Sequence, residues 1–165
     1  MNTLSLTIEA ARPSDEAQIE KLHQRAFGPG RFARTAYRIR EQAGDAEMLA
    51  YVARVGSLLV GSVQLTPVMI GEARVFVLGP LTVEPAFEGR GIGAALLERA
   101  AQAARALRAA AILLVGDEPY YGRHGYKRVP PGRITMPGPV DPGRLLMLAI
   151  TEEAASLSGL VKPTR

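Results

Sequence analysis

Residues 81–94 read LTVEPAFEGRGIGA and carry more structural information than any other part of this chain. The apolar residues at the start predict the end of a strand, and Gly89, Gly91 and Gly93 predict a tight turn that opens a long helix. The first N–H groups of a helix lack intrahelical partners and carry the positive end of the helix dipole. A strand, a glycine-rich turn and a helix in succession therefore predict a cradle for a phosphate group.

The spacing of the glycines argues against two common nucleotide-binding motifs. A P-loop requires a lysine followed by Ser or Thr, and neither follows here. The dinucleotide fingerprint is G-x-G-x-x-G with an acid about 20 residues further on. Here the third glycine comes one residue early, and no acid lies between Glu98 and Asp117. A strand-to-helix turn that packs closely and binds nothing stays open as the structural alternative.

The composition is that of a globular protein. The chain has 165 residues, 47% hydrophobic and 22% charged, which fits one domain over residues 1–165. The absence of cysteine excludes disulfides, thiolate zinc sites and a cysteine nucleophile, and it suits a reducing cytoplasm. Neither a signal peptide nor an apolar run of about 20 residues is found, so we expect a soluble cytoplasmic protein that does not bind membranes.

The net charge of +4 is unevenly distributed. Six cations and no acid lie between Lys21 and Arg40, and five cations with only Asp141 as an acid lie between Tyr120 and Arg144. Such regions attract anions. Aromatic residues make up only 5% of the chain and do not alternate with the basic ones, which disfavours nucleic acid as a partner and favours a small anionic ligand.

Hydrophobic periodicity predicts an α/β or α+β domain with a mixed sheet. Strands are expected at residues 4–8, 48–55, 58–68, 74–83, 111–115 and 144–150, and helices at residues 13–27, 32–43 and 89–108. Because proline cannot donate to a sheet ladder, Gly79-Pro80 predicts a bulge or a splayed edge. Residues 129–144 are expected to be largely irregular, and residues 151–165 form a poorly specified tail.

Two motifs resemble the GNAT superfamily of N-acetyltransferases. Residues 78–100, LGPLTVEPAFEGRGIGAALLERA, resemble its acyl-CoA-binding core, in which a strand enters a (Gln/Arg)-x-x-Gly-x-(Gly/Ala) turn. Glu88 departs from the first position of that pattern, and we expect it to face solvent because a carboxylate would repel a pyrophosphate. Residues 120–126, YYGRHGY, are similar to the (Phe/Tyr)-Tyr-x-x-x-Gly-(Phe/Tyr) segment of the family.

Within the superfamily, residues 27–41 together with residues 113–126 look like the YhbS-type subgroup. The resemblance implies a mixed, mostly antiparallel central sheet flanked by helices, with a splay after the fourth strand. It also implies acetyl-CoA as co-substrate, no metal, and direct transfer of the acetyl group to an amine of a small molecule or peptide, by a monomer or homodimer. The alternatives are a non-catalytic module that binds or senses acyl-CoA, and a nucleotide or nucleic-acid binder.

By the same resemblance, Tyr121 donates a proton to the CoA sulfur, and the alternative is a packing residue; Tyr120 is expected in the core. For the base we favour Glu84, at the end of the strand that precedes the glycine turn. The other candidates for the base are His23, Asp117, Glu118 and His124.

The resemblance places the cofactor along the backbone. The main chain of Leu81, Thr82 and Val83 pairs with the pantetheine arm and supplies the oxyanion donor. The pyrophosphate is held by the turn and the first helical residues, Gly89, Arg90, Gly91, Ile92, Gly93 and Ala94. Arg90 is the favoured side-chain contact, ahead of Arg123 and Arg128. Arg31, Arg34 and Arg38 share a helical face that suits an acidic acceptor or simply solvent.

Overall fold

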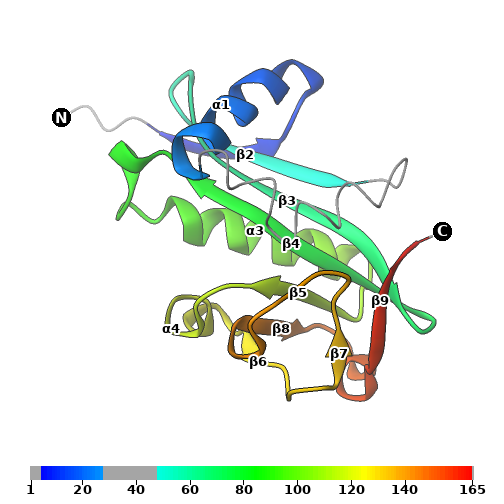
Figure 1. Cartoon of the computed structure of the whole chain (residues 1–165). Helices are drawn as coiled ribbons and strands as arrows, with labels where there is room; N and C mark the ends of the chain where they lie inside the picture. The colour runs from blue at the N-terminus through cyan, green and yellow to red at the C-terminus, as the bar shows by residue number, and fades with distance from the viewer. Residues whose placement is uncertain (1–4, 28–47, 165) are drawn as a thin grey trace.

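The computed structural model describes residues 5–27 and 48–164 (Figure 1). The predicted helix over residues 32–43, with Arg31, Arg34 and Arg38, lies outside the described residues. Within the described part of the chain, no helix is long and apolar enough to cross a membrane.

A twisted sheet in the order β1-β2-β3-β4-β5-β8-β6 forms the centre of the molecule (Figure 1). All neighbours in this order are antiparallel except β4 and β5, which are parallel, so the predicted mixed and mostly antiparallel sheet is confirmed. Its strands are β1 (Leu6–Ala10), β2 (Leu49–Val55), β3 (Leu58–Ile70), β4 (Ala73–Val83), β5 (Ala111–Val115), β8 (Leu145–Ala149) and β6 (Lys127–Arg128).

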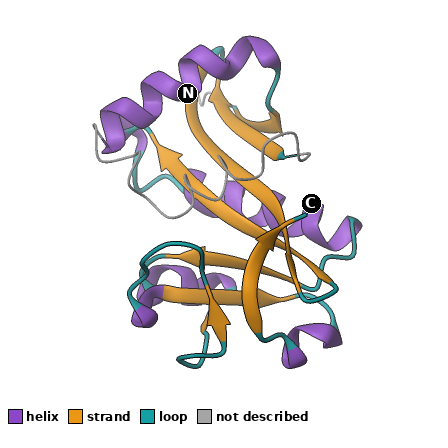
Figure 2. Cartoon of the chain, turned by 45° about the vertical axis from the view of Figure 1, so that its right-hand side comes forward, coloured by secondary structure: helices purple, strands orange, loops and turns teal. Residues whose placement is uncertain are grey.

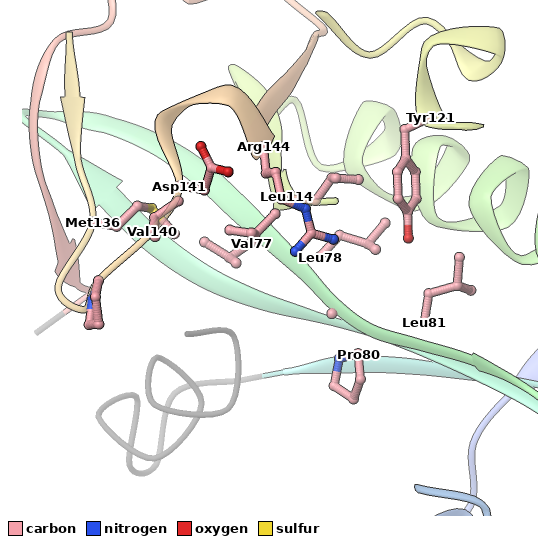
Figure 3. A pocket seen from close by; sticks show the side chains of 13 residues that line it. Val77, Leu78, Pro80, Leu81, Leu114, Tyr121, Met136, Val140, Asp141 and Arg144 are labelled. Carbon is pink, nitrogen blue, oxygen red and sulfur yellow. The ribbon is translucent and has the colours of Figure 1, made fainter. Parts of the chain in front are cut away.

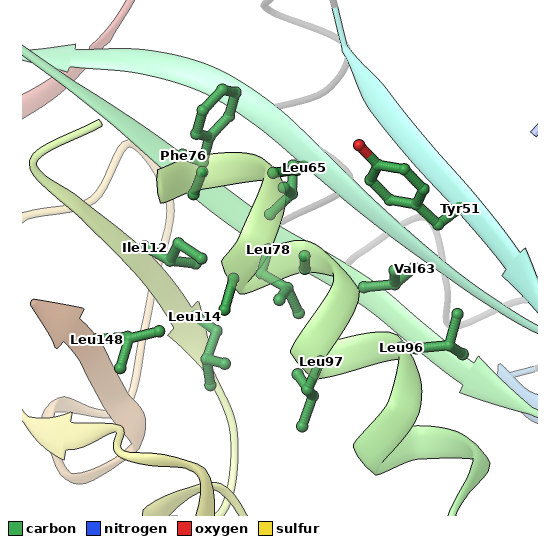
Figure 4. Close-up of a cluster of buried hydrophobic side chains, with 14 of the residues drawn as sticks. Tyr51, Val63, Leu65, Phe76, Leu78, Leu96, Leu97, Ile112, Leu114 and Leu148 are labelled. Carbon is green, nitrogen blue, oxygen red and sulfur yellow. The ribbon is translucent and has the colours of Figure 1, made fainter. Parts of the chain in front are cut away.

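Helices cover the two faces of this sheet. The helix α1 (Glu16–Phe27) buries Ile19 and Leu22 against Val52 and Leu59. On the opposite face lies α3 (Ile92–Ala106), whose Ala and Leu residues favour a helix intrinsically. Its buried stripe, which includes Leu96 and Leu97, packs on β3, β4 and β5 (Figure 4).

The long strands β3 and β4 are buried on both faces. Leu65 and Leu78 point toward α3, in one cluster with Ile112 and Leu114 of β5 (Figure 4). Alternate residues form a second cluster on the other side, which includes Val75, Val77, Leu113, Met136, Leu157 and Val161. Burial on both sides explains why these strands read as nearly continuous apolar runs rather than alternating ones.

The strands β4 and β5 separate after a short pairing. Residues 75–77 of β4 pair with residues 111–113 of β5, and β4 then continues to Val83 without β5 beside it. The register between β3 and β4 shifts at Val63/Leu65, near the cis peptide Gly79-Pro80. The predicted irregularity at Gly79-Pro80 and the splay after the fourth strand are both present.

The C-terminal segment is more ordered than the sequence suggests. Residues 159–163 form β9 (Gly159–Pro163), which pairs with β3 and with the short strand β7 (Ile134–Thr135), beside the C-terminus (Figure 2). Arg133 donates hydrogen bonds to the backbone carbonyls of Leu157, Ala154 and Ala155 and so ties the turn before β9 to β7. The segment we expected to be a poorly specified tail therefore contains a paired strand, and the segment we expected to be irregular contains β7.

Candidate active site

The glycine turn lines one side of an open pocket of about 620 Å³, called here the glycine-turn pocket. Residues of β4, of the turn and first turn of α3, and of the short helical segments α4 (Glu118–Tyr121) and η4 (Gly122–His124) surround it. They are Leu81, Val83, Phe87, Glu88, Gly89, Gly91, Ile92, Gly93, Ala94, Tyr120, Tyr121, Arg123 and His124.

The backbone of the turn is accessible because of its glycines. Gly89 and Gly91 have φ of +77° and +80°, in the left-handed region that favours glycine, and a Cβ at either position would meet nothing within 4 Å. Gly91 is the N-cap of α3, and the first helical hydrogen bond runs from Ala95 N–H to the carbonyl of Gly91 at 3.0 Å. The preceding N–H groups, on residues 92–94, have no intrahelical partner and are available to an anion.

Tyr121 lies between this pocket and a second one. Its half-buried ring packs against Gly116, where a Cβ would collide with it, and meets the ring of Tyr120 edge-on at 4.9 Å. The Tyr126 ring lies 6.0 Å away, and burial raises the pKa of the Tyr126 hydroxyl, with a smaller contribution from Tyr121. Tyr126 is therefore neutral at physiological pH.

The second pocket occupies the space opened where β4 and β5 separate, and we call it the splay pocket. It has a volume of about 260 Å³, and the Tyr121 side chain extends toward Leu81 at one side of it (Figure 3). The opposite wall comes from the segment that precedes β8: Met136, Pro139, Val140, Asp141 and Arg144. Leu81 and Tyr121 line both pockets, so the two meet at these side chains.

The side chains that line the splay pocket are apolar except for Tyr121, Asp141 and Arg144, and polar atoms contribute much of its exposed surface. The Arg144 guanidinium lies between Asp141 and Tyr121 in the view of Figure 3, and its Nε is 3.3 Å from Oδ1 of Asp117. The Asp141 carboxylate accepts a hydrogen bond from the Gly143 N–H at 2.9 Å. A ligand in this pocket meets apolar surface near Tyr121 and charge near Arg144.

Glu84 does not line either pocket. Its Oε2 accepts hydrogen bonds from Nε and Nη2 of Arg25 at 3.0 and 2.6 Å, which links the end of β4 to α1. Both hydrogen bonds from Arg25 end on the same oxygen, so the pair holds the carboxylate through Oε2 and leaves Oε1 outside the contact.

The other candidates for the base differ in their partners and in their position relative to the pockets. Asp117 pairs with Arg144, and Glu118 pairs with Arg128 at 3.2 Å. His23 is buried on α1 with Nδ1 4.0 Å from Oε2 of Glu20. Only His124 among them lines the glycine-turn pocket.

The side chains predicted to contact phosphate or to lie in the core take the following positions. Arg90 is exposed and its guanidinium lies 5.0 Å from the ring centroid of Phe87, outside the pocket lining, whereas Arg123 does line the pocket. Tyr120, which we expected in the core, is half-buried and lines the pocket as well. Glu88 is exposed, as expected, but at the border of the pocket.

The stretch of β4 that is predicted to pair with the pantetheine arm borders the glycine-turn pocket. Thr82 is buried and pairs with Ser62 of β3, while Leu81 and Val83 on either side of it line the glycine-turn pocket. Within the described residues, the edge of β4 that faces away from β3 has no strand beside it in this region, since β5 pairs only with residues 75–77. Such an edge can accept an extended ligand by backbone hydrogen bonds.

Sequence reasoning missed Gly116 and the wall of the splay pocket from Met136 to Arg144. Nothing in the neighbouring sequence marks Gly116, because glycine is required there only by the Tyr121 ring that packs against it. The wall lies in a stretch rich in proline and glycine, which predicts loop structure but not what the loop faces. No cluster of three or more His, Cys, Asp or Glu that could hold a metal occurs in residues 5–27 and 48–164.

An open strand edge, a glycine turn at a helix N-terminus and a tyrosine between two pockets are the features of an acyl-CoA-dependent acetyltransferase. The sequence model of the GNAT acetyltransferase family matches residues 16–126, and the chain belongs to this family of N-acetyltransferases. The family predicted from the two motifs is thereby confirmed.

Individual relatives agree with this assignment. An uncharacterised N-acetyltransferase, YjhQ of Escherichia coli K12, is 27% identical over 131 residues, covering 77% of this chain and 72% of YjhQ. The crystal structure of the GNAT family N-acetyltransferase YhbS of Escherichia coli in complex with CoA has a TM-score of 0.83 at 24% identity, covering 98% of this chain and 91% of YhbS. At this level of identity, the similarity to YhbS shows a shared fold. A GNAT family acetyltransferase of Brucella melitensis in complex with acetyl-CoA has a TM-score of 0.69 at 26% identity, covering 96% and 95% of the two chains.

Proposed function

We propose that this enzyme binds acetyl-CoA in the glycine-turn pocket and transfers the acetyl group directly to an amine held in the splay pocket. The observation that supports this most strongly is that the two pockets share Leu81 and Tyr121. A thioester and an amine that enter from the two sides would meet at this place. Binding both reactants in contact removes much of the entropic cost of a bimolecular reaction.

The cofactor is placed by backbone groups. Its diphosphate lies on the N–H groups of the turn and of the first turn of α3, residues 89–94. Its pantetheine arm runs along residues 81–83, where no strand of the described part of the chain pairs with this edge of β4. The complexes of the relatives with CoA and acetyl-CoA support the choice of ligand.

The amine nitrogen attacks the thioester carbonyl carbon, and the tetrahedral intermediate then expels the CoA thiolate. A backbone N–H near Thr82 and Val83 stabilises the oxyanion. The hydroxyl of Tyr121 gives its proton to the departing sulfur, and the proton lost by the amine replaces it through a base or a chain of water molecules. Glu84 remains our candidate for this base, with Arg25 held on its Oε2.

Tyr121→Phe tests this mechanism. Loss of a general acid lowers kcat by about 10²–10⁴-fold, while the Kd for CoA, which depends on the backbone, stays within about twofold. Tyr126→Phe is the matched control, because it removes a neighbouring hydroxyl that lies in neither pocket. An unchanged kcat in Tyr121→Phe would remove the tyrosine from the mechanism.

The acceptor is a small-molecule or peptide amine, and a screen of amines, amino acids and peptide N-termini with acetyl-CoA identifies its class by release of free thiol. A module that only senses acyl-CoA would bind acetyl-CoA and release no thiol with any of them.

A further inference from the structure

Tyr120 lines the glycine-turn pocket, and the proposed mechanism gives its hydroxyl no part. It lies directly against the α-carbon of Gly93, because a Cβ built on Gly93 would be 2.5 Å from this oxygen. Among the described residues, none receives a hydrogen bond from it or donates one to it. The hydroxyl thus has no hydrogen-bond partner in residues 5–27 and 48–164, and it lies beside the N–H groups that open α3.

Aromatic contacts hold the Tyr120 ring in this position. The ring meets Tyr121 edge-on at 4.9 Å and lies 5.5 Å from the ring of His124. The guanidinium of Arg123 lies 5.2 Å from the ring centroid and is attracted to its π face. Contacts on several sides give the hydroxyl a defined position, so a ligand does not have to order it.

We propose that the Tyr120 hydroxyl donates a hydrogen bond to a phosphate oxygen of the CoA diphosphate, beside the backbone N–H groups of the turn. This inference rests on the proposed function, which places the diphosphate on residues 89–94. A phenol is neutral at physiological pH and always carries a proton to donate. Hydrogen bonds to a charged oxygen are stronger than those between neutral groups. Tyr120 is then a binding residue, with a part distinct from that of Tyr121.

The choice of glycine at position 93 fits this assignment. A Cβ there would lie 3.8 Å from Cζ of Tyr120 and 3.9 Å from Cγ2 of Val83, both ordinary contacts. Of these three atoms, only the hydroxyl oxygen, at 2.5 Å, would have to be displaced by the methyl group of alanine. Glycine in a helix is less favourable than alanine, so its presence here is consistent with a requirement for the hydroxyl.

Calorimetric titration of CoA into the full chain tests the proposal. In Tyr120→Phe, the Kd for CoA should rise about ten- to hundredfold, as for loss of one hydrogen bond to a charged oxygen. The loss should appear more strongly in the KM for acetyl-CoA than in kcat, the opposite of what Tyr121→Phe should show. Dephospho-CoA, which lacks the 3′-phosphate, should show the same loss, because the contact is to the diphosphate.

Gly93→Ala provides a second, independent measurement. In the wild-type background its methyl group displaces the hydroxyl and should weaken CoA binding about as much as Tyr120→Phe does. In the Tyr120→Phe background the methyl group fits, and the additional loss should be less than about twofold. Circular dichroism and thermal unfolding verify that each variant is folded.

Two results would overturn the inference: an unchanged Kd in Tyr120→Phe, or an equal cost of Gly93→Ala in both backgrounds. A loss seen with CoA but not with dephospho-CoA would also overturn it, since the hydroxyl would then serve the 3′-phosphate. Failure of the wild type to bind CoA would instead reject the proposed function.

Discussion

Replacing Gly91 with valine separates the backbone requirement of the glycine turn from its proposed contact with CoA. Gly91 has φ of +80°, and a Cβ there would meet no atom within 4 Å, so the side chain would occupy open space in the pocket. A side chain in the left-handed region costs about 1–2 kcal/mol. For a domain of this size, that cost lowers Tm by about 2–8 °C.

The effect on binding should be larger than the effect on stability. A valine side chain beside the N–H groups of residues 92–94 keeps the diphosphate from reaching at least one of them. Loss of one hydrogen bond to a charged oxygen costs about 1.5–3 kcal/mol, which raises Kd by about ten- to hundredfold. Calorimetry with CoA measures this change, and differential scanning fluorimetry measures Tm.

The chain supplies a matched control at Gly132. It also has φ of +80° and open space around its Cβ, but it lies in neither the glycine-turn pocket nor the splay pocket. Gly132→Val should therefore lower Tm by a similar amount and leave the Kd for CoA unchanged. Equal affinities of the two variants for CoA would refute the placement of the diphosphate on this turn.

Three further variants test other parts of the structure. Gly116→Ala should push the Tyr121 ring from its position and lower kcat more than tenfold, with CoA affinity less affected; wild-type turnover would show that the ring position is unimportant. Val140→Phe should fill part of the splay pocket and raise the KM for the acceptor amine without changing the Kd for CoA, and an unchanged acceptor KM would place the acceptor elsewhere. Arg54→Met should reduce the free energy of unfolding at pH 7 by about 1–2 kcal/mol, because Arg54 pairs with Asp15 at the edge of the sheet. The hydrogen bond from Arg54 holds the pKa of Asp15 below its usual value, so the stability it contributes is present above about pH 4 and is lost at lower pH. The difference in stability between wild type and Arg54→Met should therefore shrink in urea titrations below pH 4, and a constant difference would contradict this account.

The parts of the site that depend on local chemistry could be predicted from the sequence. The glycine turn was found because backbone conformation and free N–H groups are properties of a few consecutive residues. Its helix begins at Ile92 rather than at residue 89, since the left-handed conformations of Gly89 and Gly91 precede the first helical turn.

The parts that depend on distant residues could not be predicted. The position of Glu84 at the end of β4 was foreseen, but its partner Arg25 lies 59 residues away on α1. The strand β9 has one buried residue, Val161, with exposed neighbours on both sides, so its sequence carries no alternating pattern. It forms because β3 and β7 offer it unpaired edges, and this depends on how the whole sheet is assembled.

The two pockets of the proposed active site draw on two separate stretches of the sequence. The family match ends at Tyr126, whereas the far wall of the splay pocket begins at Met136. If that pocket receives the amine, as proposed, descendants of one ancestral gene could change what they acetylate by exchanging some ten residues after the shared region. The glycine-turn pocket, which binds CoA in this proposal, would stay unchanged. This gives a physical reason why enzymes of one fold acetylate unrelated amines.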